Sequence, residues 1–337
     1  MNTKRWIALV AAAVLLFFSL GLNTIMAVFT TDFFSSFESA FDVTESTVYE
    51  TPIENGAMDN RIALVSVEGT ILDVGSGSWW EEVQYNHQGF MAQLDSILND
   101  DTVKGVVLEV NSPGGGVIES AEIHEKLVQI KEQREIPIYV SMGTYAASGG
   151  YYIAAPADKI FAQKETITGS IGVIMQAINY EELAEKVGIK FETIKSGQHK
   201  DMLGGSRAST EEEKAMLQEI IDESYEDFVD VIEQGRGMTE AEVKAVADGR
   251  ILGGTQAVRA GLVDDIGKLD DTIAALRADY GLEDAQLFEY TTTNDSLGSL
   301  LGVKVSSLFG PSQEEQLMQK ILSTSNSPRM MYLYGEY

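Results

Sequence analysis

Two apolar strands that each run directly into a glycine-rich loop and then a helix restrict most strongly how this chain can fold. The first strand, residues 103–110, enters the loop Asn-Ser-Pro-Gly-Gly-Gly, and the second, residues 137–142, enters Gly-Thr-Tyr-Ala-Ala-Ser-Gly-Gly. Apolar residues recur at helical spacing in residues 89–98 and 117–133, beside these strands. Strands that alternate with helices over about 120 residues predict an α/β fold with a largely parallel sheet.

Further elements extend this pattern. Residues 62–67, 159–162 and 171–175 have the apolar composition of short strands, and a turn is expected at residues 168–170. From residue 210 onward the pattern becomes helical, with one long helix followed by helices at residues 239–247 and 270–280. We therefore expect a folded body at residues 61–290 with a helical C-terminal part.

The N-terminus indicates a membrane anchor. No charged residue occurs between Trp6 and Thr31, and residues 6–29 would span about 36 Å as a helix, enough for about 30 Å of hydrocarbon. Lys4 and Arg5 precede the segment, so residues 1–5 are expected in the cytoplasm and the rest outside it. A cleaved signal peptide is the alternative, but no clear A-x-A site closes the stretch.

Two segments flank the expected body. Residues 30–60 contain seven acidic residues and no basic one, which predicts an acidic stalk that is either a plain linker or partly interfacial. Residues 291–337 are rich in Ser, Gly and Thr at first, which predicts a flexible tail.

Composition excludes several functions. A net charge of −28 repels phosphate backbones, so a nucleic-acid partner is not expected. Cysteine is absent, which removes thiol nucleophiles, thiolate zinc sites and disulfides. Only three histidines are present, so a histidine metal site is not expected, and we expect no other cofactor.

The glycine-rich loop at residues 112–116 precedes a helix, so its backbone N–H groups can converge on an anion. It matches neither G-x-x-x-x-G-K-[ST] nor G-x-G-x-x-G, which argues against phosphate. Two interpretations remain. The donors can stabilise the oxyanion of an acyl transfer, or the glycines simply permit a tight turn.

Ser148 is the candidate nucleophile. Small residues flank it in Ala-Ala-Ser-Gly-Gly, after a strand, in the manner of a nucleophile elbow, although Ala146 replaces the first glycine of G-x-S-x-G. The alternative is a serine that caps a helix. Two histidines are poor bases for it, because His124 belongs to a helix and His87 to a polar loop where we expect it to be solvated.

The turn at residues 195–201 offers both His199 and Lys200 as bases. A lysine accepts a proton only when it is neutral, a state that burial in an apolar pocket favours. A close carboxylate would oppose that state, so we expect Asp201 to point away and cap a helix.

Four motifs occur together and in order: residues 111–116 (NSPGGG), 146–152 (AASGGYY), 168–173 (TGSIGV) and 194–201 (IKSGQHKD). Together they resemble the signal peptide peptidase A (SppA) family of bacteria, in its short form with one catalytic domain per chain. The resemblance covers residues 61–290 and the Ser-Pro-Arg-Met-Met-Tyr ending.

The resemblance implies a ClpP/crotonase-like fold, a single membrane anchor, and a membrane-bound serine endopeptidase that degrades remnant signal peptides. Matched position by position, it makes Ser148 the nucleophile, Lys200 the general base and Ser170 the hydroxyl that orients the lysine. The N–H groups of Gly115 and Gly149 match the oxyanion hole. It also implies a homo-oligomeric ring of eight chains, because the lysine of one chain must reach the serine of a neighbour.

Two alternatives from other classes stay open at this point. A crotonase-type acyl-CoA enzyme shares the fold and the paired N–H donors, but it would require carboxylates facing its substrate and a cytosolic location. A non-catalytic membrane scaffold would use the ring without the chemistry.

The C-terminus carries a separate expectation. Residues 327–334 are apolar apart from Arg329, begin with Ser-Pro and have no helical periodicity, so they can be extended. A groove that binds apolar peptides by strand addition could accept this segment. The alternative is a tail packed on a neighbouring subunit.

Overall fold

The centre of the fold is a run of parallel strands in which nearly every side chain is buried. The computed structural model describes residues 47–73, 85–293 and 329–335. Strands β2 (Ala57–Glu68), β3 (Val103–Ser112) and β5 (Ile138–Ala147) pair in parallel. Their continuous Val, Ile and Leu runs follow from burial on both faces of the sheet.

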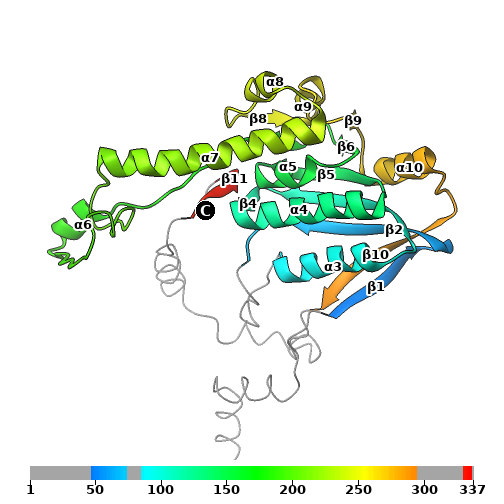
Figure 1. The fold of residues 1–337 in the computed structure, drawn as a ribbon, viewed down its shortest axis with the longest axis horizontal. Coiled ribbons are helices and arrows are strands. Elements are labelled where there is room, and N and C mark those ends of the chain that lie inside the picture. Colours follow the sequence, from blue (N-terminus) through cyan, green and yellow to red (C-terminus); the bar gives the residue numbers. More distant parts are fainter. Residues whose placement is uncertain (1–46, 74–84, 294–328, 336–337) are drawn as a thin grey trace, which may run out of the picture. The chain divides into compact units, whose positions relative to one another are not determined.

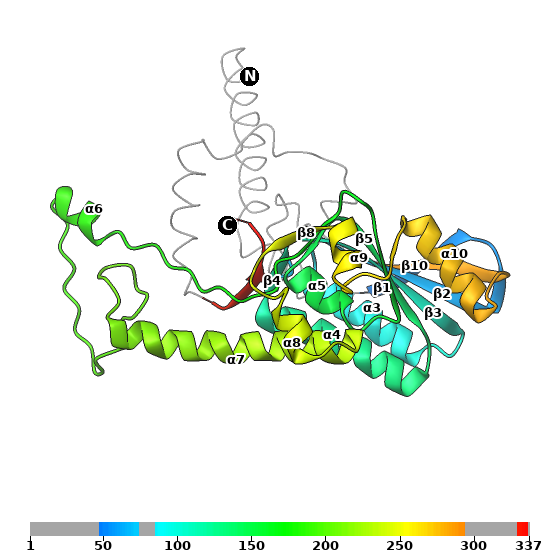
Figure 2. The same ribbon diagram turned by 90° about the horizontal axis from the view of Figure 1, so that it is seen from above.

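The described strands extend this centre to a nine-stranded sheet of order β1-β10-β2-β3-β5-β6-β9, with β7 and β8 attached beside β5 (Figures 1 and 2). All its pairs are parallel except β1 with β10 and β7 with β8. The outer strands are β1 (Thr47–Glu54), β6 (Lys159–Ala162), β7 (Ile167–Gly169), β8 (Ile251–Gly253), β9 (Asp265–Ile266) and β10 (Ala285–Thr293).

Helices cover both faces of the sheet. Alternate residues of β2 divide between two cores: Ala63 and Val65 pack with the side of the sheet that carries α3 (His87–Asn99), α4 (Val117–Arg134) and α5 (Gly149–Ala154). Ile62 and Leu64 pack on the other side, against α10 (Leu269–Tyr280). This period-two division is the one expected of a strand with both faces buried.

A long arm leaves the body after β7. We use "the arm" for residues 174–210, which include the short helix α6 (Glu181–Lys186). The chain returns through α7 (Glu211–Arg236), whose C-terminal half packs on the body while its N-terminal half extends with the arm (Figures 1 and 2). The remaining helices are α8 (Glu240–Lys244) and α9 (Gly254–Arg259).

The α/β architecture and the largely parallel sheet are confirmed, and two boundaries are wrong. The sheet includes residues 47–54 and 57–60, within the range expected to be an acidic stalk, because β1 pairs with β10 and β2 begins at Ala57. Residues 171–175 do not form a strand beyond a single bridge at Ile174, and the strand lies at residues 167–169, where a turn was expected.

Three expectations lie partly or wholly outside the described residues: the anchor at 6–29, the first part of the stalk, and most of the tail. Within the part of the chain that the structure describes, no helix is long and apolar enough to cross a membrane.

Candidate active site

Ser148 lies at the end of β5, immediately before α5. Its backbone has φ 53° and ψ −116°, a strained conformation that non-glycine residues rarely adopt. The residue occupies the N-cap position of α5, yet its hydroxyl forms no cap hydrogen bond. It is 1% exposed, and its Oγ has no hydrogen-bond partner among the described residues. The helix-capping interpretation is therefore wrong, and the strained turn fits a nucleophile elbow.

Two backbone N–H groups lie beside this serine. Gly115 belongs to the short strand β4 (Gly114–Gly116), which follows β3, and Gly149 is the first residue of α5. A Cβ placed on Gly149 would lie 3.0 Å from the Gly115 nitrogen, tighter than most real Cβ contacts, so the two backbones lie close together. Gly114 has φ +99°, which only glycine adopts without strain. The loop is thus a turn that requires glycine, and it places the Gly115 backbone beside that of Gly149.

Ser170 is also brought to this place. Strand β7 pairs with the end of β5, with Gly169 opposite Ala147, and the Ser148 backbone N–H donates to the Gly169 carbonyl at 2.8 Å. Ser170 follows directly, half-buried, at φ 52°. The fold therefore gathers four of the five predicted site residues at the carboxyl ends of neighbouring strands.

Lys200 is the exception. It lies in a turn of the arm, is exposed, and its ammonium group makes no hydrogen bond or ion pair to any residue that the structure describes. Both views place the helix α6 at the outer part of this arm, away from α5 (Figures 1 and 2). A single chain does not bring Lys200 into hydrogen-bonding contact with Ser148.

A polar cluster fixes the turn that carries Lys200. Asp201 accepts hydrogen bonds from Lys195 at 2.6 Å and Arg207 at 2.5 Å, so it faces these cations and caps no helix. Glu213, in the first turn of α7 and only 1% exposed, accepts from both terminal nitrogens of Arg207 at 2.6 and 2.8 Å. These hydrogen bonds hold the pKa of each carboxyl well below its usual range.

The three histidines are engaged elsewhere. We expected His87 to be solvated, but the residue is buried. Its two ring nitrogens contact the Tyr85 hydroxyl at 2.9 Å and the Glu122 carboxylate at 2.7 Å, so both are satisfied. His124 packs on Tyr152, and burial lowers its pKa to about 4. His199 lies 3.3 Å from Glu213. Each of these contacts is with a residue other than Ser148.

The C-terminal segment lies in the candidate site. Strand β11 (Met331–Leu333) pairs antiparallel with β4, with Tyr332 opposite Gly115. On its other side Met331 exchanges backbone hydrogen bonds with Ile174 at 2.9 and 3.1 Å. The Tyr332 carbonyl oxygen lies 3.1 Å from where a Cβ on Gly149 would be. The expectation of an extended tail bound by strand addition is confirmed, and the Tyr332 carbonyl lies beside the backbones of Gly115 and Gly149.

The Tyr332 side chain fills a pocket that the sequence analysis did not identify. The residue is 1% exposed; its ring stacks on Tyr152 at 4.9 Å and packs on Phe228 at 4.7 Å. Its hydroxyl donates to the Ser224 carbonyl at 2.8 Å. Phe228 and Ser224 belong to α7, whose helical periodicity gave no sign that one of its faces borders a site.

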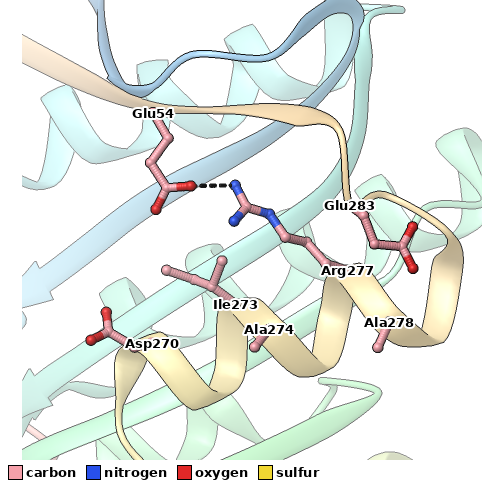
Figure 3. Close-up of a pocket in the computed structure, with 7 residues that line it drawn as sticks. All are labelled: Glu54, Asp270, Ile273, Ala274, Arg277, Ala278 and Glu283. Carbon is pink, nitrogen blue, oxygen red and sulfur yellow. Dashed lines mark hydrogen bonds and ion pairs between the residues drawn. The ribbon is translucent and has the colours of Figure 1, made fainter.

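Another hollow, of about 320 Å³, lies against α10 and contains none of these residues (Figure 3). It is lined by Glu54, Asp270, Glu283 and Arg277, with an ion pair of 2.7 Å between Arg277 and Glu54. It offers no nucleophile. Among the described residues, no group of three or more His, Asp or Glu side chains is placed to hold a metal ion.

Comparison with known proteins gives concordant matches. The model of Peptidase family S49 matches residues 130–283. A candidate signal peptide peptidase SppA of Enterococcus faecium is 42% identical over 99% of both chains. Protease 4 of Haemophilus influenzae is 32% identical over 84% of this chain and 48% of its own length, and the chloroplast serine protease SPPA of Arabidopsis thaliana is 31% identical over 74% of this chain and 37% of its own.

Proposed function

The chain belongs to peptidase family S49, in the signal peptide peptidase A family, and is a serine peptidase; from this premise we propose that Ser148 and Lys200 form its catalytic dyad and that it degrades remnant signal peptides. The observation that carries the proposal is the Ser148 hydroxyl, unpartnered among the described residues, on a strained turn where the backbones of Gly115 and Gly149 lie close together. A ClpP/crotonase-like form of the α/β fold belongs to the same proposal.

In this mechanism the Ser148 Oγ attacks the carbonyl carbon of the scissile bond while its proton passes to the neutral amine of Lys200. The N–H groups of Gly115 and Gly149 donate to the oxyanion that forms, and Ser170 orients the lysine. Collapse of the tetrahedral intermediate breaks the C–N bond, and the lysine returns the proton to the leaving amine. Water then hydrolyses the acyl-enzyme by the same route.

Lys200 would come from a neighbouring chain. The arm exposes large apolar side chains from residue 174 to residue 194, which a monomer leaves in water. They are Ile174, Ile178, Tyr180, Leu183, Val187, Ile189, Phe191 and Ile194. Burial of these side chains against a second copy of the chain would bring Lys200 of the arm to Ser148 of that copy. Lys200 would then be buried as well, which favours its neutral amine. A closed ring of eight chains is the assembly we propose.

The apolar N-terminal segment supports a membrane location, with residues 6–29 as the anchor and the peptidase body outside the cytoplasm. Signal peptides are short and apolar, and they remain in the membrane after cleavage from their preproteins. An anchored peptidase with an apolar, strand-binding groove suits such substrates.

The test is digestion of a synthetic signal peptide by the full-length protein in detergent, with product masses identifying the cleaved bonds. Ser148→Ala and Lys200→Ala should each lose activity by several orders of magnitude, whereas the matched control His199→Ala should lose little. Mixing the two inactive variants should restore part of the activity. A dead histidine variant with an active lysine variant refutes the dyad, and no recovery in rings shown to be mixed refutes the shared site.

A further inference from the structure

Ser120 is a buried hydroxyl that nothing in the proposed dyad uses. It lies in the first turn of α4, the helix that precedes β5 and Ser148 in the chain, and it is 0% exposed. Its Oγ has no hydrogen-bond partner among the described residues, not even the carbonyl of Gly116 one turn earlier, the usual acceptor for a helical serine. A buried hydroxyl without a partner costs about 1–3 kcal/mol, so its presence calls for an explanation.

The position of the Ser120 hydroxyl explains why an unpaired hydroxyl is present there. A Cβ built on Gly149 would lie 2.6 Å from Ser120 Oγ, 3.0 Å from the Gly115 nitrogen and 3.1 Å from the Tyr332 carbonyl oxygen. Ser120 Oγ therefore borders the same small space as an N–H group of the candidate oxyanion hole and a bound carbonyl. The α4 N-terminus, which has no side-chain cap, also lies here, directly after Gly116.

Close packing alone does not require a hydroxyl at this place. If the residue served only to let α4 approach α5, alanine would fill the site equally well and would avoid the desolvation cost of an unpaired hydroxyl. What alanine lacks is a donor that can turn toward a negative charge. A neutral carbonyl attracts such a donor weakly, whereas an oxyanion in a space closed to water attracts it strongly.

We propose that the Ser120 hydroxyl is a third donor to the oxyanion hole, acting with the N–H groups of Gly115 and Gly149. The proposal rests on the dyad assignment, because it concerns the oxyanion that attack by Ser148 creates. The hydroxyl contributes more in the transition state than in the bound substrate, so its loss lowers kcat and leaves KM almost unchanged.

The test uses Ser120→Ala in the full-length protein, with a short apolar peptide as substrate. We expect kcat to fall about 100-fold, the loss typical of one oxyanion donor, with KM within about twofold. Binding of a peptide aldehyde, whose adduct with Ser148 carries the oxyanion, should weaken by the same factor, while binding of the cleaved peptide should not. The thermal midpoint should stay equal or rise, since an unpaired hydroxyl is removed.

Ser96→Ala is the matched control, because this half-buried serine on α3 donates to the Ala92 carbonyl at 2.9 Å, away from the site. It should keep full kcat. A Ser120→Ala kcat within twofold of wild type overturns the proposal, and so does a kcat loss accompanied by a lower thermal midpoint and unchanged aldehyde affinity. If instead Ser148→Ala retains activity, it is the dyad that fails, so the two failures are distinguishable.

Discussion

Replacement of Tyr332 by alanine should release the C-terminal strand from the candidate groove and lower the apparent KM for short peptides. The side chain is buried between Tyr152 and Phe228, and its hydroxyl is bonded to the Ser224 carbonyl. Truncation of a buried aromatic side chain costs about 3–5 kcal/mol. At about 1.4 kcal/mol per factor of ten, the docking constant of the strand should fall by roughly two to three and a half orders of magnitude.

The effect on KM follows from how often the groove is free. The strand is tethered, with an effective concentration on the order of millimolar for a flexible connection, so even weak affinity keeps the groove occupied. Apparent KM scales inversely with the free fraction. With that fraction at about a tenth or less in wild type, Tyr332→Ala should lower KM by about tenfold or more, toward the value of a variant that lacks residues 327–337, with kcat unchanged.

Initial rates on a short apolar fluorogenic peptide give both constants. Tyr334→Ala is the matched control: it removes the same side chain two residues later, where the ring is only half-buried and lies 6.3 Å from the Tyr145 ring. It should change KM much less. The reasoning is refuted if Tyr332→Ala has the wild-type KM, or if both tyrosine variants lower KM equally.

Three further predictions follow from the site. Active protein should cleave its own Tyr332–Leu333 bond, because that carbonyl lies beside Gly115, and Ser148→Ala should keep the full C-terminus; intact mass distinguishes them. Peptidase activity should rise between pH 6 and 9, because only the neutral amine of Lys200 accepts the proton, and a falling profile contradicts a lysine base. The lowered pKa of Glu213, ordinarily 4.5, means that its contacts stabilise the arm fully above that pH and progressively less below it. The protection of the arm against hydrogen exchange, relative to intrinsic exchange at each pH, should fall there in wild type and fall less in Glu213→Gln, where only Asp201 still titrates.

The centre of the fold could be predicted from the sequence because burial on both faces produces short apolar runs, rich in Val and Ile, that end in glycine-rich loops. The edge could not. Strand β1 contains Pro52 and several exposed residues, and its partner β10 lies more than two hundred residues away in the chain, so neither strand has a clear local pattern. His87 was misplaced for the same reason, since the residues that bury it, such as Glu122, come from another helix.

The candidate site likewise contains some residues that the sequence could identify and others that it could not. Ser148 and Gly115 were identifiable because a strained turn and a close backbone approach demand small residues locally, and the sequence records that demand. Ser120 and Phe228 were not, because each reads as an ordinary position on a helix. Their relation to the site depends on how α4 and α7 pack, which periodicity does not specify.

The separation of Ser148 from Lys200 within one chain bears on how the activity would be controlled. If Ser148 is the nucleophile, its hydroxyl, which has no partner among the described residues, would be inert until a base arrives. The arm that would carry this base exposes apolar side chains. Assembly and activation would then be one event, driven by burial of that surface. The strand at Tyr332 occupies the groove independently of the arm, so an assembled site would still exclude peptides that bind less tightly than the tethered tail. Short, apolar, extended segments can meet that condition, because they can pair along the groove as the tail strand does.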